Sequence, residues 1–234
     1  MKQITIAVIM LFSASIFAQT NTELKDHYEV YYQQMKKQGD VQGIINAITH
    51  LNILEPSIAR QDTLAYLYLS EGKYLQALNT IGVEKNATDS DINVEVKALA
   101  LKNLNQPKLA LEHYEELFKR NPNVFLAYEM ADMKLQTNDI AGAKSNIEYG
   151  LANVKDDMKR AFYETQQPYE TSMKAALLYL KGIMLYSENK TNVDASIKLM
   201  NDALAIDTNF NMAKVSRQAL ENQKAQQAAA TKKN

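Results

Sequence analysis

Small turn residues recur at one fixed interval along much of this chain. Gly39, Gly72, Asn105 and Asn138 each stand 33 residues after the last, and each lies in a short polar turn. Gly and Asn tolerate the left-handed backbone with which many helices end. A fixed interval of this size is typical of repeat architectures, in which each unit buries its apolar surface against its neighbours. The interval therefore predicts a row of stacked structural units.

Apolar stretches of helical period, about 12–14 residues long, flank each turn. The same small or apolar positions return five residues after and seven residues before each turn, where they let two helix axes approach closely. These positions are Ile44, Ala77, Ala110 and Ala143 after the turns, and Tyr32, Ala65, Ala98 and Ala131 before them. The 234 residues contain only 7 Gly and 4 Pro, few for a fold built on many tight β-turns. Each unit is thus expected to be a pair of helices.

The second and third units carry the most specific pattern. Residues 64–68 with 72–78, and residues 109–114 closing on Arg120-Asn121-Pro122, resemble the tetratricopeptide repeat (TPR), a helix–turn–helix unit of about 34 residues. The resemblance covers roughly residues 24–208 and includes a fifth unit with two extra turn residues. It implies an all-α, TPR-type helix–turn–helix solenoid of about five repeats. Residues 212–227 form an amphipathic pattern that predicts a C-terminal capping helix.

Some positions depart from the repeat pattern. Lys97 and Lys134 stand where apolar packing residues are usual. Gly82 and Glu84 weaken the second helix of the second unit, so we expect a short helix followed by a polar loop over residues 85–91.

About 18 extra residues separate the fourth and fifth units. Ile147, Leu151, Val154, Met158 and Phe162 continue a helical rhythm through this region. One interpretation is a long helix to about residue 165 and a turn at 166–168, which would make residues 155–168 a projecting helical hairpin. The other is an insertion with a short irregular helix that fills a poor repeat junction.

The two ends of the chain are expected to lie outside the solenoid of residues 19–227. Residues 1–18 have a positive start, an apolar run and a small residue before the expected cut, as in a secretory signal peptide. Residues 228–234 are expected to fray. The chain has no Cys, and a Cys-free exported protein of this size fits the periplasm of a Gram-negative bacterium, with secretion as the alternative.

No constellation of catalytic or metal-ligating residues is evident in the sequence. The 26 Lys and Arg residues balance 27 Asp and Glu residues, which leaves no basic excess for nucleic-acid binding. The absence of Cys excludes thiolate metal sites and Cys nucleophiles, and His113 with Glu116 lacks a third metal ligand. We therefore expect no enzyme, cofactor, metal, membrane insertion, nucleic acid or small-molecule substrate.

The resemblance implies that the first helix of each unit lines a concave surface. The residues on its exposed stripe would form a partner-binding groove with aromatic and acidic character. Its predicted residues are Asp62, Tyr66, Leu69, Glu95, Leu99, Tyr128, Asp132, Tyr179 and Tyr186, with Lys102, Leu135 and Ile183 on the same stripe and Phe125 near its edge. The alternative is that these tyrosines pack between adjacent helices. Family members that grip a C-terminal carboxylate use Lys, Asn and Arg on this stripe. None of the matching residues here is Lys or Arg, so the resemblance does not imply such a clamp; they are Asp62, Tyr66, Glu95, Leu99, Tyr128 and Asp132.

These features together predict an exported protein–protein interaction scaffold or adaptor of the TPR kind from a bacterium. It would bind a protein or peptide of the cell envelope through the groove. The alternative function is a structural subunit of an envelope assembly or transport machine, held through its edges or through the 155–168 hairpin. The sequence does not identify the partner.

Overall fold

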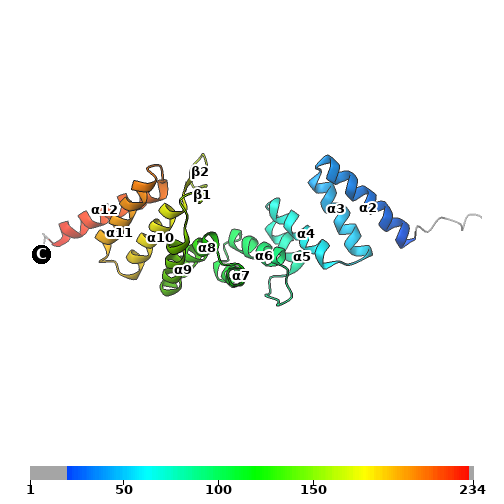
Figure 1. Ribbon diagram of the computed structural model, residues 1–234, viewed down its shortest axis with the longest axis horizontal. Helices are drawn as coiled ribbons and strands as arrows, with labels where there is room; N and C mark the ends of the chain where they lie inside the picture. The colour runs from blue at the N-terminus through cyan, green and yellow to red at the C-terminus, as the bar shows by residue number, and fades with distance from the viewer. Residues whose placement is uncertain (1–19, 232–234) are drawn as a thin grey trace, which may run out of the picture. The chain divides into compact units, whose positions relative to one another are not determined.

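A computed structural model describes residues 20–231 of the chain, so the predicted signal peptide and the last three residues lie outside the described part. The described residues form helices α2 to α12 and two short strands (Figure 1). The chain divides into two compact units, one up to Val83 and one from Glu84 onward, and each is described by itself. Within residues 20–231, no helix combines the length and the apolar character that a membrane span requires.

The first unit consists of two helix pairs. Its helices are α2 (Asn21–Gln38), α3 (Val41–Leu54), α4 (Ile58–Ser70) and α5 (Tyr74–Ile81). Each helix packs on the next one along the chain. Ile45, Ile48 and Leu64 form its buried centre. Helix α5 has only 8 residues and ends at Gly82, which confirms the expected short helix.

The second unit continues the same pattern. Its helices are α6 (Asp91–Asn103), α7 (Pro107–Arg120), α8 (Val124–Gln136), α9 (Ile140–Asn153), α10 (Met173–Glu188), α11 (Val193–Ile206) and α12 (Asn211–Thr231). Consecutive helices pack together, and buried side chains from α8 to α12 form one large core that includes Leu177, Met200 and Phe210. Helix α12 packs on α11 and buries Leu220, as expected of a capping helix. Helix α12 extends to Thr231 and so includes the first four residues of the segment 228–234, which was expected to fray.

The predicted turn residues adopt the predicted backbone. The φ angles are 68° at Gly39, 69° at Gly72, 57° at Asn105 and 63° at Asn138, all in the left-handed region. After each of them, the next residue donates its N–H to a carbonyl five residues earlier, at 2.8–3.0 Å. This hydrogen bond closes the end of the first helix of each pair. Local backbone chemistry therefore explains why Gly or Asn recurs at these positions.

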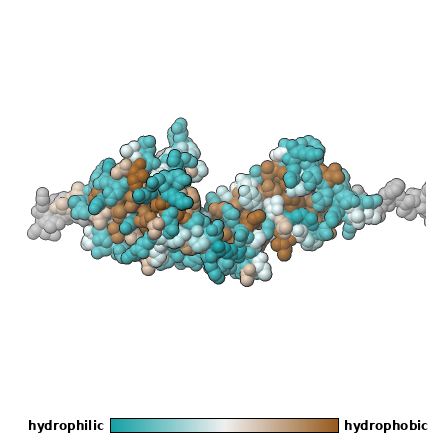
Figure 2. Space-filling view, in the orientation of Figure 1, coloured by the Kyte–Doolittle hydropathy of each residue, from teal (hydrophilic) through white to brown (hydrophobic). Residues whose placement is uncertain are grey.

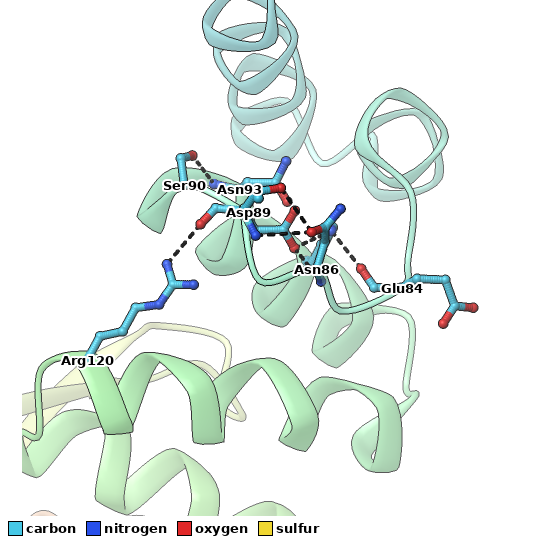
Figure 3. Close-up of polar contacts among 8 residues, drawn as sticks. Glu84, Asn86, Asp89, Ser90, Asn93 and Arg120 are labelled. Carbon is cyan, nitrogen blue, oxygen red and sulfur yellow. Dashed lines mark hydrogen bonds and ion pairs between the residues drawn. The ribbon is translucent and has the colours of Figure 1, made fainter.

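Lys97 is buried at a position where the repeat usually has an apolar residue. Its Nζ donates to the carboxylate of Asp89 at 2.7 Å and to the carbonyl oxygen of Glu84 at 2.8 Å. Figure 3 shows the loop in which these acceptors lie, with the Asn86 backbone N–H donating to Asp89 and Arg120 donating to the Asp89 carbonyl. The lysine thus satisfies the polar groups of the loop that precedes α6.

The predicted helical structure of residues 155–168 is wrong in both of its forms. Helix α9 ends at Asn153, and strands β1 (Lys159–Phe162) and β2 (Tyr169–Ser172) form an antiparallel hairpin next to α10 (Figure 1). The register pairs Arg160 with Thr171 and Phe162 with Tyr169. These four side chains share one face of the hairpin, because side chains alternate along a strand. The helix therefore ends before Val154 although the apolar rhythm continues to Phe162. Contacts of this face of the hairpin with the helices stabilise the strand conformation instead.

Candidate functional site

Exposed apolar side chains occur in both units and do not by themselves identify a site. Figure 2 shows hydrophobic residues at the surface of each unit among hydrophilic ones. Ile53, Ile58 and Leu75 are more than half exposed in the first unit, and Phe125 is 45% exposed in the second. A site that selects a ligand needs a concave surface with polar groups placed around it.

One surface cleft of the second unit has these properties. It has a volume of about 490 Å³ and lies among α6, α7 and α8. We call it the α6–α8 cleft. Its lining residues are Asp91, Glu95, Leu99, Tyr114, Leu117, Arg120, Asn121, Asn123, Phe125, Leu126 and Glu129.

Helix geometry brings the apolar lining together. Leu99 stands four residues after Glu95, so both lie on one face of α6. Helix α8 begins after Asn123, whose side chain accepts a hydrogen bond from the Leu126 N–H at 2.9 Å. This N-cap places Phe125 in the first turn of α8, where its ring is partly exposed. The first helices of two successive pairs thus contribute to the cleft, and α7 contributes Tyr114 and Leu117.

Most charges at the cleft are already paired. Arg120 forms ion pairs with Asp91 at 2.8 Å and with Glu116 at 3.0 Å. Glu129 accepts from both Lys102 and Arg160. Burial alone would raise the pKa of Glu129, but the positive charges of Arg160 and Lys102 hold it below its usual value. Glu129 is therefore a structural carboxylate with its charge fully compensated.

Glu95 differs from the other acidic residues of the cleft. It is exposed, and no other described residue forms an ion pair or hydrogen bond with its carboxylate. It lies near Tyr114, whose pKa it helps to raise. Glu95 is therefore available to a cation from outside the chain.

Tyr114 is the buried polar residue of the cleft. Its side chain is 3% exposed, and its hydroxyl has no hydrogen-bond partner among the described residues. Burial raises the pKa of the Tyr114 hydroxyl, and the charge of Glu129 raises it further, so the hydroxyl remains a proton donor at neutral pH. A buried donor without an acceptor carries a free-energy cost of about 1–3 kcal/mol.

Two predicted groove tyrosines are buried, Tyr128 beneath the hairpin and Tyr179 against the segment between α11 and α12. Tyr128 is 3% exposed, and the Arg160 guanidinium lies 4.2 Å from its ring centroid. Tyr179 is 8% exposed and packs edge-on against Phe210, with ring centroids 5.4 Å apart. The expectation that these two rings face a groove is therefore incorrect, and the alternative of packing between elements describes them.

The remaining predicted residues have different surroundings. In the first unit, Asp62 is buried, Leu69 is half-buried and Tyr66 is 50% exposed, and none of them lines the α6–α8 cleft. In the second unit, Tyr186 is half-buried and donates its hydroxyl hydrogen to Gln223 of α12. Asp132 accepts from Gln136 at 3.1 Å. Of the nine predicted residues, the structure places Glu95 and Leu99 in the cleft.

Several cleft residues escaped the sequence prediction. Tyr114 stands at the position where the other units have Ile48, Ile81 and Ile147, so an aromatic residue in an aliphatic position was the available signal. Glu129 lies one residue beyond the predicted stripe. Arg160 does not line the cleft but pairs with Glu129, which is 31 residues earlier, so no local signal indicated its role.

Known proteins resemble this chain in structure only. No family model and no curated protein matches the sequence. The crystal structure of YrrB, a TPR protein with an unusual peptide-binding site, aligns with a TM-score of 0.63 and 14% identity, over 82% of this chain and 90% of that one. A tetratricopeptide repeat protein from Parabacteroides merdae ATCC 43184 aligns with a TM-score of 0.63 and 15% identity, over 88% and 76% of the two chains.

A third structure, that of MamA protein, aligns with a TM-score of 0.56 and 14% identity, over 80% of this chain and 93% of that one. Identities this low are evidence of a common fold alone. They agree with the helix pairs and the left-handed turns seen here, so this chain has the tetratricopeptide repeat fold.

Proposed function

We propose that this protein is a non-enzymatic interaction scaffold that binds a segment of a partner protein in the α6–α8 cleft. The observation that carries the proposal is the cleft itself, with Leu99, Leu117 and a partly exposed Phe125 surrounded by charged groups. Apolar anchors inside a polar rim are the usual composition of a protein-binding surface. The TPR fold and the peptide-binding description of YrrB support this role.

The proposed setting is the envelope of a Gram-negative bacterium. It rests on the signal-peptide pattern of residues 1–18, which ends at Ala18. Intact-mass measurement of the protein from its native host tests it: a chain that begins at Gln19 supports export, and retention of residues 1–18 contradicts a soluble exported protein.

Capture of the partner from the native host tests the binding function. Phe125→Ala removes the most exposed apolar side chain of the cleft and should reduce capture at least tenfold, since aromatic anchors commonly contribute about 2 kcal/mol or more. Leu109→Ala is the matched control, because Leu109 is 44% exposed on α7 but lies outside the cleft. Equal capture by both variants would exclude the cleft as the binding surface.

A second candidate function is a structural subunit held through the hairpin. The observation in its favour is Tyr163, which directly follows β1 and is 75% exposed. Tyr163→Ala should then abolish capture, whereas Phe125→Ala should have no effect. The two candidate functions therefore predict opposite results for the same pair of variants.

A further inference from the structure

The charges around the α6–α8 cleft specify which kind of segment it can hold. We propose that the bound segment presents an apolar side chain to the cleft and, next to it, a Lys or Arg that pairs with Glu95. This inference rests on the proposed function, and it adds the chemistry of the partner. It assigns Glu95 as the residue that determines specificity.

The apolar side chains that line the cleft determine what kind of side chain the bound segment can insert. Leu99, Leu117, Phe125 and Leu126 come from three different helices and border one concavity. A leucine-sized or aromatic side chain placed among them would bury part of its surface against theirs. Removal of apolar surface from water favours binding of such a side chain.

The charge expected on the bound segment follows from the ion pairs that already exist around the cleft. Four charged side chains line the cleft, and three of them, Asp91, Arg120 and Glu129, have partners of opposite charge within the chain. Arg120, Lys102 and Arg160 are engaged in these pairs, so they offer little to an acidic segment. An acidic segment would instead meet the unpaired carboxylate of Glu95, and like charges in contact disfavour binding.

A second observation points to a polar contact inside the cleft. Tyr114 lines the cleft and has a buried hydroxyl without an acceptor among the described residues. Such groups are rare in folded proteins because the missing hydrogen bond is costly. An inserted segment whose carbonyl oxygen reaches this hydroxyl would supply the missing acceptor, which favours a peptide over a purely apolar ligand.

Labelled synthetic peptides test the inference with the full-length protein. The probes are nine-residue alanine-based peptides with a central Leu flanked on both sides by Lys, Gln or Glu, and binding is followed by fluorescence anisotropy at low salt. The Lys-flanked peptide should bind about three- to fivefold more tightly than the Gln-flanked one, as expected for an exposed ion pair. The Glu-flanked peptide should bind most weakly.

Two matched variants assign the preference to one residue. Glu95→Lys should reverse the order, so that the Glu-flanked peptide binds best. Glu112→Lys makes the same change of charge at an exposed position of α7 outside the cleft, and it should leave the order unchanged. If Glu95→Lys keeps the preference for Lys, or if both variants shift it equally, the inference is overturned.

Phe125→Ala separates this inference from the proposed function. If Phe125→Ala abolishes binding of all three peptides but the wild type binds them equally, the cleft is a binding site and only the assigned chemistry is wrong. If no peptide binds to the wild type, or if Phe125→Ala leaves binding unchanged, both the inference and the function proposed for the cleft are overturned.

Discussion

Two charged residues, Lys97 and Asp132, show how the surroundings of a charge decide its effect on the stability of the fold. Lys97 takes the place of an apolar residue because it neutralises Asp89 and satisfies a loop carbonyl. Asp132 lies close to Glu129, Lys102 and Arg160. Burial raises the pKa of the Asp132 carboxyl, and the neighbouring charge of Glu129 raises it further. The two sites therefore predict opposite responses to loss of charge.

Lys97→Ala should lower the free energy of unfolding by about 3 kcal/mol, because it leaves Asp89 as a buried charge without a cationic partner. Urea denaturation measures this change. The double variant Lys97→Met with Asp89→Asn should recover most of the loss, since no charge is then buried. Lys108→Ala on the surface of α7 is the control, with an expected change below about 0.5 kcal/mol. If the double variant recovers nothing, lost packing rather than the unpaired charge causes the effect.

Asp132→Asn should raise the free energy of unfolding at pH 7 by roughly 0.5–1 kcal/mol. A carboxyl whose pKa is raised by folding destabilises the folded state when it is ionised, and this penalty disappears as the pH falls through its pKa. The advantage of the variant should therefore shrink as the pH is lowered from 7 toward the ordinary Asp value of 3.8. An advantage that is constant over this range would show that the charge of Asp132 is not its origin.

At the scale of elements, the β1–β2 hairpin covers part of the surface that the repeat pattern assigns to a groove. Its inner face directs Arg160 to Tyr128 and Glu129, and Phe162 to Phe210 at 5.1 Å between ring centroids. Thr171 donates to the carboxylate of Asp207, at the end of α11. The hairpin thus joins α8 to the last helices of the second unit, and the α6–α8 cleft remains open beside it.

Arg160→Ala should lower the free energy of unfolding by about 1–3 kcal/mol, because Tyr128 loses its cation–π contact and Glu129 loses one of its two cationic partners. Urea denaturation compares it with Lys159→Ala, which removes an exposed side chain from the same strand and should have little effect. Equal stability of the two variants would mean that the hairpin does not hold α8 through Arg160.

At the scale of the whole chain, local chemistry was predictable and contacts between distant residues were not. The sequence predicted the four left-handed turns and the buried positions of Ala98 and Ala110, because turn backbone and helix period depend on neighbouring residues. It did not predict the hairpin, whose strand conformation depends on contacts such as Phe162 with Phe210. Tyr128 and Tyr179 were assigned to the groove because nothing local indicated that Arg160 and Phe210 would cover them.

The central claim is that partners bind in the α6–α8 cleft, and site-specific photo-crosslinking in the native host tests it most directly. A photoreactive phenylalanine analogue is placed either at Phe125 or at Leu109, two side chains of nearly equal exposure that differ in whether they line the cleft. The account predicts one discrete crosslinked protein from position 125 and none from position 109. Crosslinks from position 109 alone, or the same products from both positions, would contradict it.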